Sequence, residues 1–568
     1  MAATEPNQKE LLKKISELEA ELKRTRKQKK YGLVWEEKPE QIVEDCKRNV
    51  PILRLKEKKK EIEPVVITDP TKDENILIEG DNYHALSVLN YTHRGKIDVI
   101  YIDPPYNTGA RDWKYNNDYV DENDAFRHSK WISMMNNRLK LARNLLKPDG
   151  VLIVTIDDWE SHTLQLLLED IFSERELTTV IIEHNPKGSP SRNFTYSHEY
   201  AHFMIPKGTA VIGSDPREKE DTRNLRRAGR ASSRKERPTM FYPIYVKDGK
   251  ITRIGSVPAD GFHPKQRNTR EKTGDIAIWP IDDDGRERRW HFGLESINDH
   301  LDRIEVRANS SGEIQLYVVA QPGRYKTVWT GGEMDAGKYG TSLVKEMLGI
   351  EFPFPKSLYA TARCLETVVF DRPNAVILDF FSGSGTTGHA TLYLNKKYGG
   401  QRKFIVCTNN ENNICEEITY PRVKKAITGY VGLSGNKVEG LGGNIRYYKT
   451  DLVDIERLHS TPDQSKVKLT YQAGEMIGLR ENTLNEVEKN DWWQIFEGNG
   501  KVSAIYFKED KEKLSDLVDL LEKKNKPTAL YIFSWGKNEY KSEYSSQNIR
   551  VEDIPEPILE VYKEINRL

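Results

Sequence analysis

The stretch Asp103-Pro104-Pro105-Tyr106-Asn107-Thr108-Gly109 governs how the rest of the chain is interpreted. It follows Ile97-Asp98-Val99-Ile100-Tyr101-Ile102, an apolar run typical of a parallel strand covered on both faces. The two prolines fix the backbone and remove two donors, so nearby carbonyls remain free acceptors. Asp103 adds a carboxylate and Tyr106 adds a flat ring for stacking. The stretch predicts a grip on the exocyclic amine of a planar heterocycle; the structural alternative is a proline turn with Tyr106 as packing.

A second constellation lies far along the chain, where a strand from Val376 runs into Asp379-Phe380-Phe381-Ser382-Gly383-Ser384-Gly385-Thr386-Thr387-Gly388. A strand, a glycine loop and a helix N-terminus form a cofactor cradle, because glycines let the backbone approach a ligand closely. A phosphate-binding P-loop is excluded, because His389 and Ala390 stand where it needs Lys and Ser/Thr. The spacing fits a dinucleotide fingerprint, but the next strand ends in Thr408-Asn409-Asn410-Glu411 without the acid expected for a ribose.

At these residues the sequence resembles the amino-methylating DNA methyltransferases, whose catalytic motif is Asp/Asn/Ser-Pro-Pro-Tyr/Phe/Trp. The catalytic stretch precedes the cofactor loop, with 276 positions between Asp103 and Asp379, which is the order of the beta group of these enzymes. Rossmann dehydrogenases place the glycine loop early in the chain. The segments Gly80-Asp81-Asn82 and Tyr31-Gly32-Leu33-Val34-Trp35-Glu36 further resemble the modification (Mod) subunit of type III restriction–modification systems. The resemblance covers about residues 30 to 430.

The resemblance implies an α/β fold, a Rossmann-like S-adenosylmethionine-dependent methyltransferase with circularly permuted motif order. It also implies an inserted target recognition domain, and a C-terminal α+β domain follows. The expected parts are an N-terminal helix and linker (1–60), the catalytic half of the core (61–184), the insertion (185–350), the cofactor half (351–430) and the C-terminal domain (431–568). In the last part we expect strands at Lys466 to Tyr471, Val502 to Phe507 and Thr528 to Phe533, and helices at Lys511 to Lys523 and Pro557 to Ile565.

The same resemblance assigns roles to individual residues. Asp103 and the Pro104 carbonyl would hold an adenine amine, with Pro105 and Tyr106 completing the catalytic motif and Tyr106 stacking on the base. The residues expected to bind S-adenosyl-L-methionine are Asp379, Phe380, Phe381, Ser382, Gly383, Gly385, Thr386, Thr387, Asp81, Lys356 and Asn409. For Asp81 a helix N-cap is an equally good interpretation, and the two are compatible. Lys356 would pack against the methionine part of the cofactor, and the ribose partner stays open among Asn409, Asn410 and Glu411.

The insertion is rich in Arg beside aromatic side chains, a combination that suits phosphate and base contacts. Acids are interleaved at Glu218, Glu220 and Asp221, so a solvated charged loop is the alternative. The residues expected to contact DNA are Asn107, Arg226, Arg227, Arg230, Arg234, Arg289 and Trp290.

The composition bounds the kind of partner and the cellular compartment to expect. The 568 residues contain 87 Lys and Arg against 87 Asp and Glu, so any nucleic-acid surface must be a local patch. The four cysteines lack metal spacing, and no apolar run approaches membrane-spanning length, so we expect a soluble cytoplasmic protein without a metal. A charged helix is expected from about Lys9 to Lys30, and Lys56 to Glu63 is expected to be a solvated linker.

Together these features predict a site-specific DNA adenine-N6 methyltransferase that flips its target base out of double-stranded DNA. An RNA methyltransferase and a DNA-binding subunit with a non-catalytic pocket remain alternatives. We expect a homodimer, with a helicase–nuclease restriction subunit as a candidate partner. The recognition sequence and the role of the C-terminal domain are not determined by the sequence.

Overall fold

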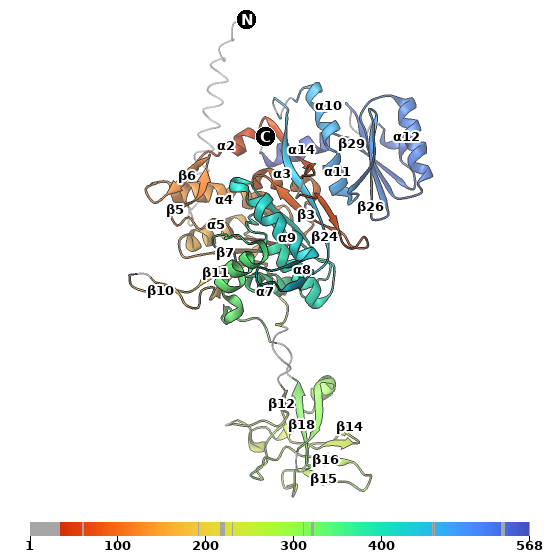
Figure 1. The fold of residues 1–568 in the computed structure, drawn as a ribbon. Helices are drawn as coiled ribbons and strands as arrows, with labels where there is room; N and C mark the ends of the chain where they lie inside the picture. The colour runs from red at the N-terminus through yellow and green to blue at the C-terminus, as the bar shows by residue number, and fades with distance from the viewer. Residues whose placement is uncertain are drawn as a thin grey trace, which may run out of the picture. The chain divides into compact units, whose positions relative to one another are not determined.

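The computed structural model describes residues 34–59, 62–190, 192–215, 222–229, 231–309, 312–319, 323–456, 458, 461–535 and 540–566. The chain folds into two compact units. Residues 1–211 and 326–568 form the larger unit, and residues 212–325 form the smaller one (Figure 1). The helix expected from Lys9 to Lys30 and the segment Tyr31 to Leu33 lie outside the described residues.

An eleven-stranded sheet organises the larger unit. Along the sheet the strands are β1 (Asn49–Leu55), β24 (Asn444–Asp454), β3 (Glu74–Glu79), β21 (Lys403–Thr408), β20 (Val376–Asp379), β4 (Ile97–Ile102), β7 (Leu146–Ile156), β11 (Glu199–Pro206), β8 (Arg175–Ile182) and β19 (Val328–Trp329), while β2 (Val65–Ile67) pairs with β24. The six strands from β24 to β7 are parallel. Strands β20 and β21 come late in the chain yet lie between β3 and β4, so the permuted order brings the two motifs to neighbouring strands.

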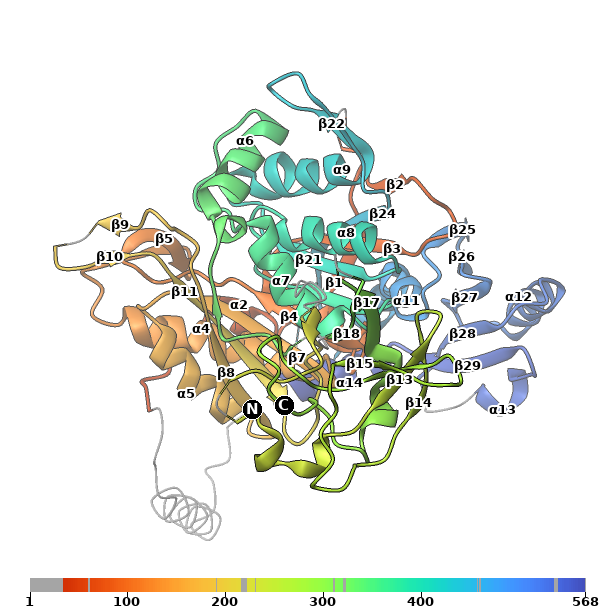
Figure 2. The ribbon, with the colours of Figure 1, turned by 90° about the horizontal axis from the view of Figure 1, so that it is seen from below.

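Helices cover both faces of this sheet, which explains the unbroken apolar strands. On one face α3 (Asn82–Thr92), α4 (Arg127–Arg143) and α5 (Ser161–Ile171) pack side by side. On the other face lie α7 (Leu358–Val369), α8 (Thr386–Tyr398) and α9 (Tyr420–Thr428) (Figure 2). Along β3, Ile76 and Ile78 join the core under α3 and Leu77 joins the core under α9, because alternate side chains point to opposite faces.

The smaller unit is narrower than the expected insertion of 185–350. Strands β11 and β19 belong to the main sheet, and α6 (Leu343–Leu348) packs on α9, because these apolar segments find buried partners there. The unit contains a three-stranded sheet of β12 (Thr222–Asn224), β18 (Ile314–Val319) and β17 (Ile304–Ala308). A four-stranded sheet contains β14 (Lys250–Ile254), β13 (Ile244–Lys247), β16 (Ile276–Ile278) and β15 (Asn268–Arg270).

The C-terminal region is not separate from the methyltransferase core. Strand β24 completes the main sheet, and a five-stranded sheet of β25 (Asn485–Lys489), β26 (Trp493–Gly498), β27 (Lys501–Tyr506), β28 (Thr528–Phe533) and β29 (Ile549–Ile554) follows. Helices α11 (Gly474–Glu481) and α14 (Glu556–Ile565) pack on α3. The Tyr562 hydroxyl donates to the Pro51 carbonyl at 2.6 Å. The two regions therefore share one apolar core.

Two local expectations are wrong. The strand expected at Lys466 to Tyr471 is helix α10 (Asp463–Gln472), which buries Leu469, so the short alternation there is helical. The expected linker from Lys56 begins with a buried side chain, because the Lys56 ammonium pairs with Glu79 and, at 2.6 Å, with Glu416.

The helix expected at Lys511 to Lys523 is α12 (Lys511–Lys523). Within the described part of the chain, no helix is both long enough and apolar enough to span a membrane.

Candidate active site

The carboxyl ends of five parallel strands bring the candidate residues to one edge of the main sheet. Asp81 follows β3, Asn409 follows β21, Asp379 ends β20, and Asp103 follows β4. Asp157 follows β7 at the same edge. In open parallel sheets this edge is where ligands bind. Tyr106 and Phe381 pack against the same apolar core, so the two predicted motifs share one side of the sheet.

The Asp103 carboxylate is anchored through one of its oxygens. Oδ1 accepts from the Thr155 hydroxyl at 2.8 Å and lies 3.0 Å from the Tyr106 hydroxyl. The Lys356 ammonium is 3.2 Å from the same oxygen. None of the described residues donates to Oδ2 or to the Pro104 carbonyl, whereas the Pro105 carbonyl accepts from Trp131 at 2.7 Å. The turn therefore presents two neighbouring acceptors to which no described residue donates.

Tyr106 is held by its hydroxyl group. The hydroxyl lies 2.9 Å from Glu199 Oε2 and accepts a hydrogen bond from Lys356. The Lys356 ammonium also lies 4.5 Å from the centre of the Tyr106 ring. Because the hydroxyl is held at one end and the backbone at the other, the long axis of the ring is fixed.

Glu199 was not found by sequence reasoning, since it lies in the segment assigned to the insertion. The only available signal was an acid opening an apolar strand, His198-Glu199-Tyr200. Its side chain is 2% exposed and pairs with Lys356. Burial disfavours the charged form, but Lys356, His184 and the Tyr106 hydroxyl together outweigh burial and hold the pKa of Glu199 below its ordinary value. Burial likewise opposes the charge of Lys356, yet Asp103 and Glu199 raise the pKa of that lysine.

Strong burial also acts on the two aspartates of the motifs. Burial raises the pKa of Asp103, and the Lys356 ammonium opposes that rise. Burial raises the pKa of Asp379 to about 7, although Thr387 and the Phe381 amide donate to it and lower it. The Asp103 charge contributes to this rise in the pKa of Asp379, so the ends of β4 and β20 lie within electrostatic range of each other.

The glycine loop has the features of a cofactor cradle. Asp379 Oδ2 accepts from the Thr387 hydroxyl at 2.5 Å and Oδ1 accepts from the Phe381 amide at 2.9 Å, which closes the loop on itself. Gly383 and Gly385 have positive φ, and a side chain on Gly385 would press on Val423 at 3.1 Å. The Ser382 hydroxyl is buried without a hydrogen-bond partner among the described residues. An orphaned donor beside an open glycine fits a polar ligand such as S-adenosylmethionine.

The remaining residues of the predicted cofactor set take varied positions. Phe380 is buried, Thr386 accepts from the buried Arg422 guanidinium at 2.8 Å, and Asn409 is exposed. Asp81 caps α3 by accepting from the Tyr83 amide at 2.7 Å, and Arg138 lies 3.4 Å from the same oxygen. Asp81 is thus the N-cap of α3, and it lies at the same edge of the sheet as the glycine loop.

Four of the expected DNA contacts are internal to the protein in this structure. Asn107 is fully buried, donates to Glu160 at 2.5 Å and accepts from Trp113 at 3.1 Å. Arg234 is buried against Phe241 and donates to backbone carbonyls and Glu287. Arg289 donates to the Ala231 carbonyl, and Trp290 donates to the Tyr242 carbonyl within the core. These side chains serve packing because their polar groups are already paired, and Arg230 lies outside the described residues.

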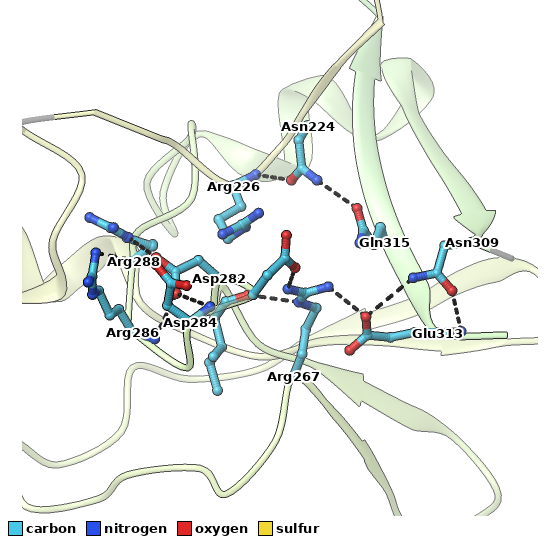
Figure 3. Close-up of polar contacts among 12 residues, drawn as sticks. Asn224, Arg226, Arg267, Asp282, Asp284, Arg286, Arg288, Asn309, Glu313 and Gln315 are labelled. Atoms are coloured by element: carbon cyan, nitrogen blue, oxygen red, sulfur yellow. Dashed lines mark hydrogen bonds and ion pairs between the residues drawn. The ribbon is translucent and has the colours of Figure 1, made fainter. Parts of the chain in front are cut away.

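Figure 3 shows why Arg226 differs from the arginines around it. Arg267 is committed to the Ile281 carbonyl, Asp283 and Glu313, and Arg288 is committed to Asp282 and Ser232. The Arg226 guanidinium has no such contact within the described part of this unit, although its backbone amide donates to Asn224 at 2.9 Å (Figure 3). Partial burial lowers the pKa of Arg226, and the Arg267 charge adds to that effect.

A second group of arginines in the smaller unit gathers around His291. Arg223 and Arg227 are exposed, and their charges act on His291 together with those of Arg289 and Arg303. Burial lowers the pKa of His291, and these four arginines lower it further. Such a concentration of cations is suited to a polyanion.

A doubly wound parallel sheet, with a free-acceptor Asp-Pro-Pro-Tyr turn beside a glycine cradle, defines an S-adenosylmethionine-dependent amino-methyltransferase. The family model of the N6/N4 DNA methylases matches residues 97–420, more than half of the protein, so the chain belongs to this DNA methylase family.

Individual relatives agree with this assignment. The chain is similar to the type II methyltransferase M.KpnI of Klebsiella pneumoniae, at 29% identity over 66% of this chain and 90% of the relative. It is also 29% identical to the type III restriction–modification enzyme EcoPI Mod subunit of Escherichia phage P1, over 60% of this chain. The match covers 58% of that subunit. Among solved structures, the chain is similar to TTHA0409 of Thermus thermophilus, a putative DNA modification methylase complexed with S-adenosyl-L-methionine, at 12% identity and a TM-score of 0.30 over 65% of this chain and 98% of that one.

Proposed function

We propose that this methyltransferase transfers a methyl group to N6 of adenine in double-stranded DNA. The observation that carries the proposal is the pair of free acceptors, Asp103 Oδ2 and the Pro104 carbonyl, at the strand end next to the glycine cradle. The Asp form of the catalytic motif favours adenine over cytosine, whose N4 amine is the other target of this family.

The chemistry follows from the two acceptors. The lone pair of an adenine amine is delocalised into the ring, so the amine is a poor nucleophile. Two hydrogen bonds from the amine to Asp103 and Pro104 favour a tetrahedral nitrogen and localise that lone pair, and the rate gain comes from orientation and electrostatics. S-adenosylmethionine, bound at the cradle, supplies the methyl group on a sulfonium. Asp379, Ser382 and Thr387 would hold it, with Asp81, Lys356 and Asn409 nearby on the same edge.

Access to the amine requires the base to leave the duplex, since a stacked base cannot reach a pocket at a strand end. The fixed ring of Tyr106 would replace the stacking that the base loses. The exposed Arg223 and Arg227 would contact phosphates, and the uncommitted guanidinium of Arg226 would reach a base edge.

The relatives suggest the biological setting. The EcoPI protein is described as the Mod subunit of a type III restriction–modification enzyme, so we propose that this chain is a modification subunit. A restriction subunit with helicase and nuclease activity and a second copy of this chain would then be its partners.

The proposal is tested by transfer of tritium from labelled S-adenosylmethionine to duplex DNA, single-stranded DNA and RNA. Asp103→Ala should lower transfer roughly 10²- to 10³-fold, because it removes one of two amine acceptors, while cofactor binding persists. Asp516→Ala on exposed α12 is the matched control and should behave like the wild type.

Each other outcome identifies an alternative. Transfer to RNA alone would assign an RNA methyltransferase, and cofactor and DNA binding without transfer would assign a non-catalytic subunit. Substantial transfer by Asp103→Ala would remove Asp103 from the mechanism.

A further inference from the structure

A buried ionic cluster includes Asp103 and Tyr106 of the catalytic turn. Its members are Asp103 after β4, Tyr106 three residues later, Glu199 at the start of β11, and Lys356 just before α7. Lys356 contacts all three of the others. Glu199 does not contact the free oxygen of Asp103, so its contacts reach Asp103 through Lys356 and Tyr106, while its charge raises the pKa of Asp103.

We propose that Glu199 is a positioning residue for methyl transfer: it holds the Lys356 ammonium against Asp103 Oδ1 and keeps the Tyr106 hydroxyl beside that oxygen, so that Oδ2 is left to the target amine. This inference rests on the proposed function. It adds a residue that the Asp-Pro-Pro-Tyr motif does not include.

The geometry explains why two fixed partners are needed. A carboxylate can rotate and can offer either oxygen, but Oδ1 of Asp103 already lies beside three donors, from Thr155, Tyr106 and Lys356. Tyr106 and Lys356 are each tied in turn to Glu199 Oε2. Without Glu199 the long lysine side chain is free to bind Oδ2 as well, where it would compete with the amine.

Charge balance gives the second argument. Two carboxylates and one ammonium leave one negative charge in excess in a buried place. Lys356 keeps Asp103 ionised, and Glu199 prevents that lysine from neutralising Asp103 completely. A carboxylate that shares its counter-ion is a better acceptor for the amine than one that is fully paired.

Other titratable groups face the same cluster and set the background for any pH profile. His184 and Asp157 lie close enough for Glu199 and Lys356 to act on their pKa values, and Asp379 responds to Asp103. Burial lowers the pKa of His184 and raises that of Asp157 to about 7. Tyr101 and Cys364 are buried beside the cluster, where burial raises the pKa of each.

The test is a charge cycle in the full-length protein. Glu199→Gln keeps the shape and an acceptor for Tyr106 but makes the cluster neutral. Lys356→Met keeps the unbranched stem but leaves two negative charges in excess. The double variant restores a single excess negative charge without either ion. Circular dichroism and cofactor binding check that each variant is folded.

The measured quantities are kcat and the pH profile of methyl transfer to duplex DNA. Glu199→Gln should lower kcat roughly ten- to a hundredfold and move the acid limb to lower pH, because Lys356 then pairs with Asp103 alone. Lys356→Met should move the acid limb to higher pH, because activity needs ionised Asp103 and its pKa rises without the ammonium. The double variant should recover most of the kcat lost in Glu199→Gln and return the limb toward that of the wild type.

A purely structural role for Glu199 gives a different pattern. The double variant would then be no better than the worse single variant, and the acid limb of Glu199→Gln would stay in place, which would overturn the inference. Wild-type kcat in Glu199→Gln would overturn it as well. Absence of transfer by the wild-type protein would instead count against the proposed function.

Discussion

Tyr106 is anchored by polar contacts at its hydroxyl, so its ring stays at the strand end, where it can serve as a stacking surface. The hydroxyl lies within hydrogen-bond distance of Asp103 and Glu199, and Lys356 donates to it. A single tyrosine thereby joins the acceptor for the amine, the surface for the ring and the buried ionic cluster. Substitution by Ala and by Phe can separate the contribution of the ring from that of the hydroxyl.

Tyr106→Ala should lower methyl transfer more than it lowers DNA binding. Base–aromatic stacking is worth about 1–3 kcal/mol, which corresponds to a loss of roughly 5- to 150-fold in kcat. Tyr106→Phe keeps the ring, so its turnover should fall less than that of Tyr106→Ala. The remaining loss comes from the missing contact between the hydroxyl and Asp103. Turnover and gel-shift affinity measured on the same duplex check this, and equal loss of both quantities in Tyr106→Ala would contradict stacking.

At the scale of elements, neighbouring arginines of the smaller unit differ in burial and pairing. Arg227 and Arg234 lie seven positions apart and looked alike in the sequence. The first is exposed beside His291, whereas the second is buried on Phe241 and pairs with Glu287 at 3.1 Å. Their substitution should therefore produce opposite phenotypes.

Arg227→Ala should leave the melting temperature unchanged, weaken binding by a similar factor on every DNA sequence, and lower the slope of log K against log salt by about 1. Arg234→Ala should destabilise the protein by about 1–3 kcal/mol, since it removes a buried guanidinium that donates to Glu287 and to two backbone carbonyls. Thermal unfolding and salt-dependent binding distinguish the two. Sequence-selective loss in Arg227→Ala would assign it to base contacts instead.

At the scale of the whole larger unit, the C-terminal sheet and the methyltransferase core share buried side chains. Phe496, Tyr531 and Tyr562 belong to the same cluster as Ile52 of β1 and Leu86 of α3. Arg94 and Glu564 pair across the same boundary at 2.5 Å. The cofactor cradle and the C-terminal sheet should therefore unfold together.

Tyr562→Ala should lower the melting temperature of this unit and the temperature at which cofactor binding is lost by the same amount. Removal of a fully buried aromatic side chain costs about 3–5 kcal/mol. Lys511→Ala on exposed α12 is the surface control. Two separate transitions, with cofactor binding retained through the first, would show that the C-terminal region folds independently.

Local chemistry accounts for the parts of the site that could be predicted. The Asp-Pro-Pro-Tyr turn, the glycine loop and the apolar strands before them carry their geometry in their own residues, because prolines and glycines set the backbone and unbroken apolar runs require a parallel sheet. Family resemblance then supplied the cofactor and the order of the motifs. Helix α12 lies where a helix was expected, near Lys511 to Lys523.

The sequence by itself determined the class of enzyme, the two motifs and the edge of the sheet where they meet. Only the tertiary structure revealed Glu199 as part of the site, separated Arg227 from Arg234, and joined the C-terminal sheet to the core. Burial and pairing are properties of contacts between distant segments, and a charged side chain looks the same in a sequence whether it meets water or a partner.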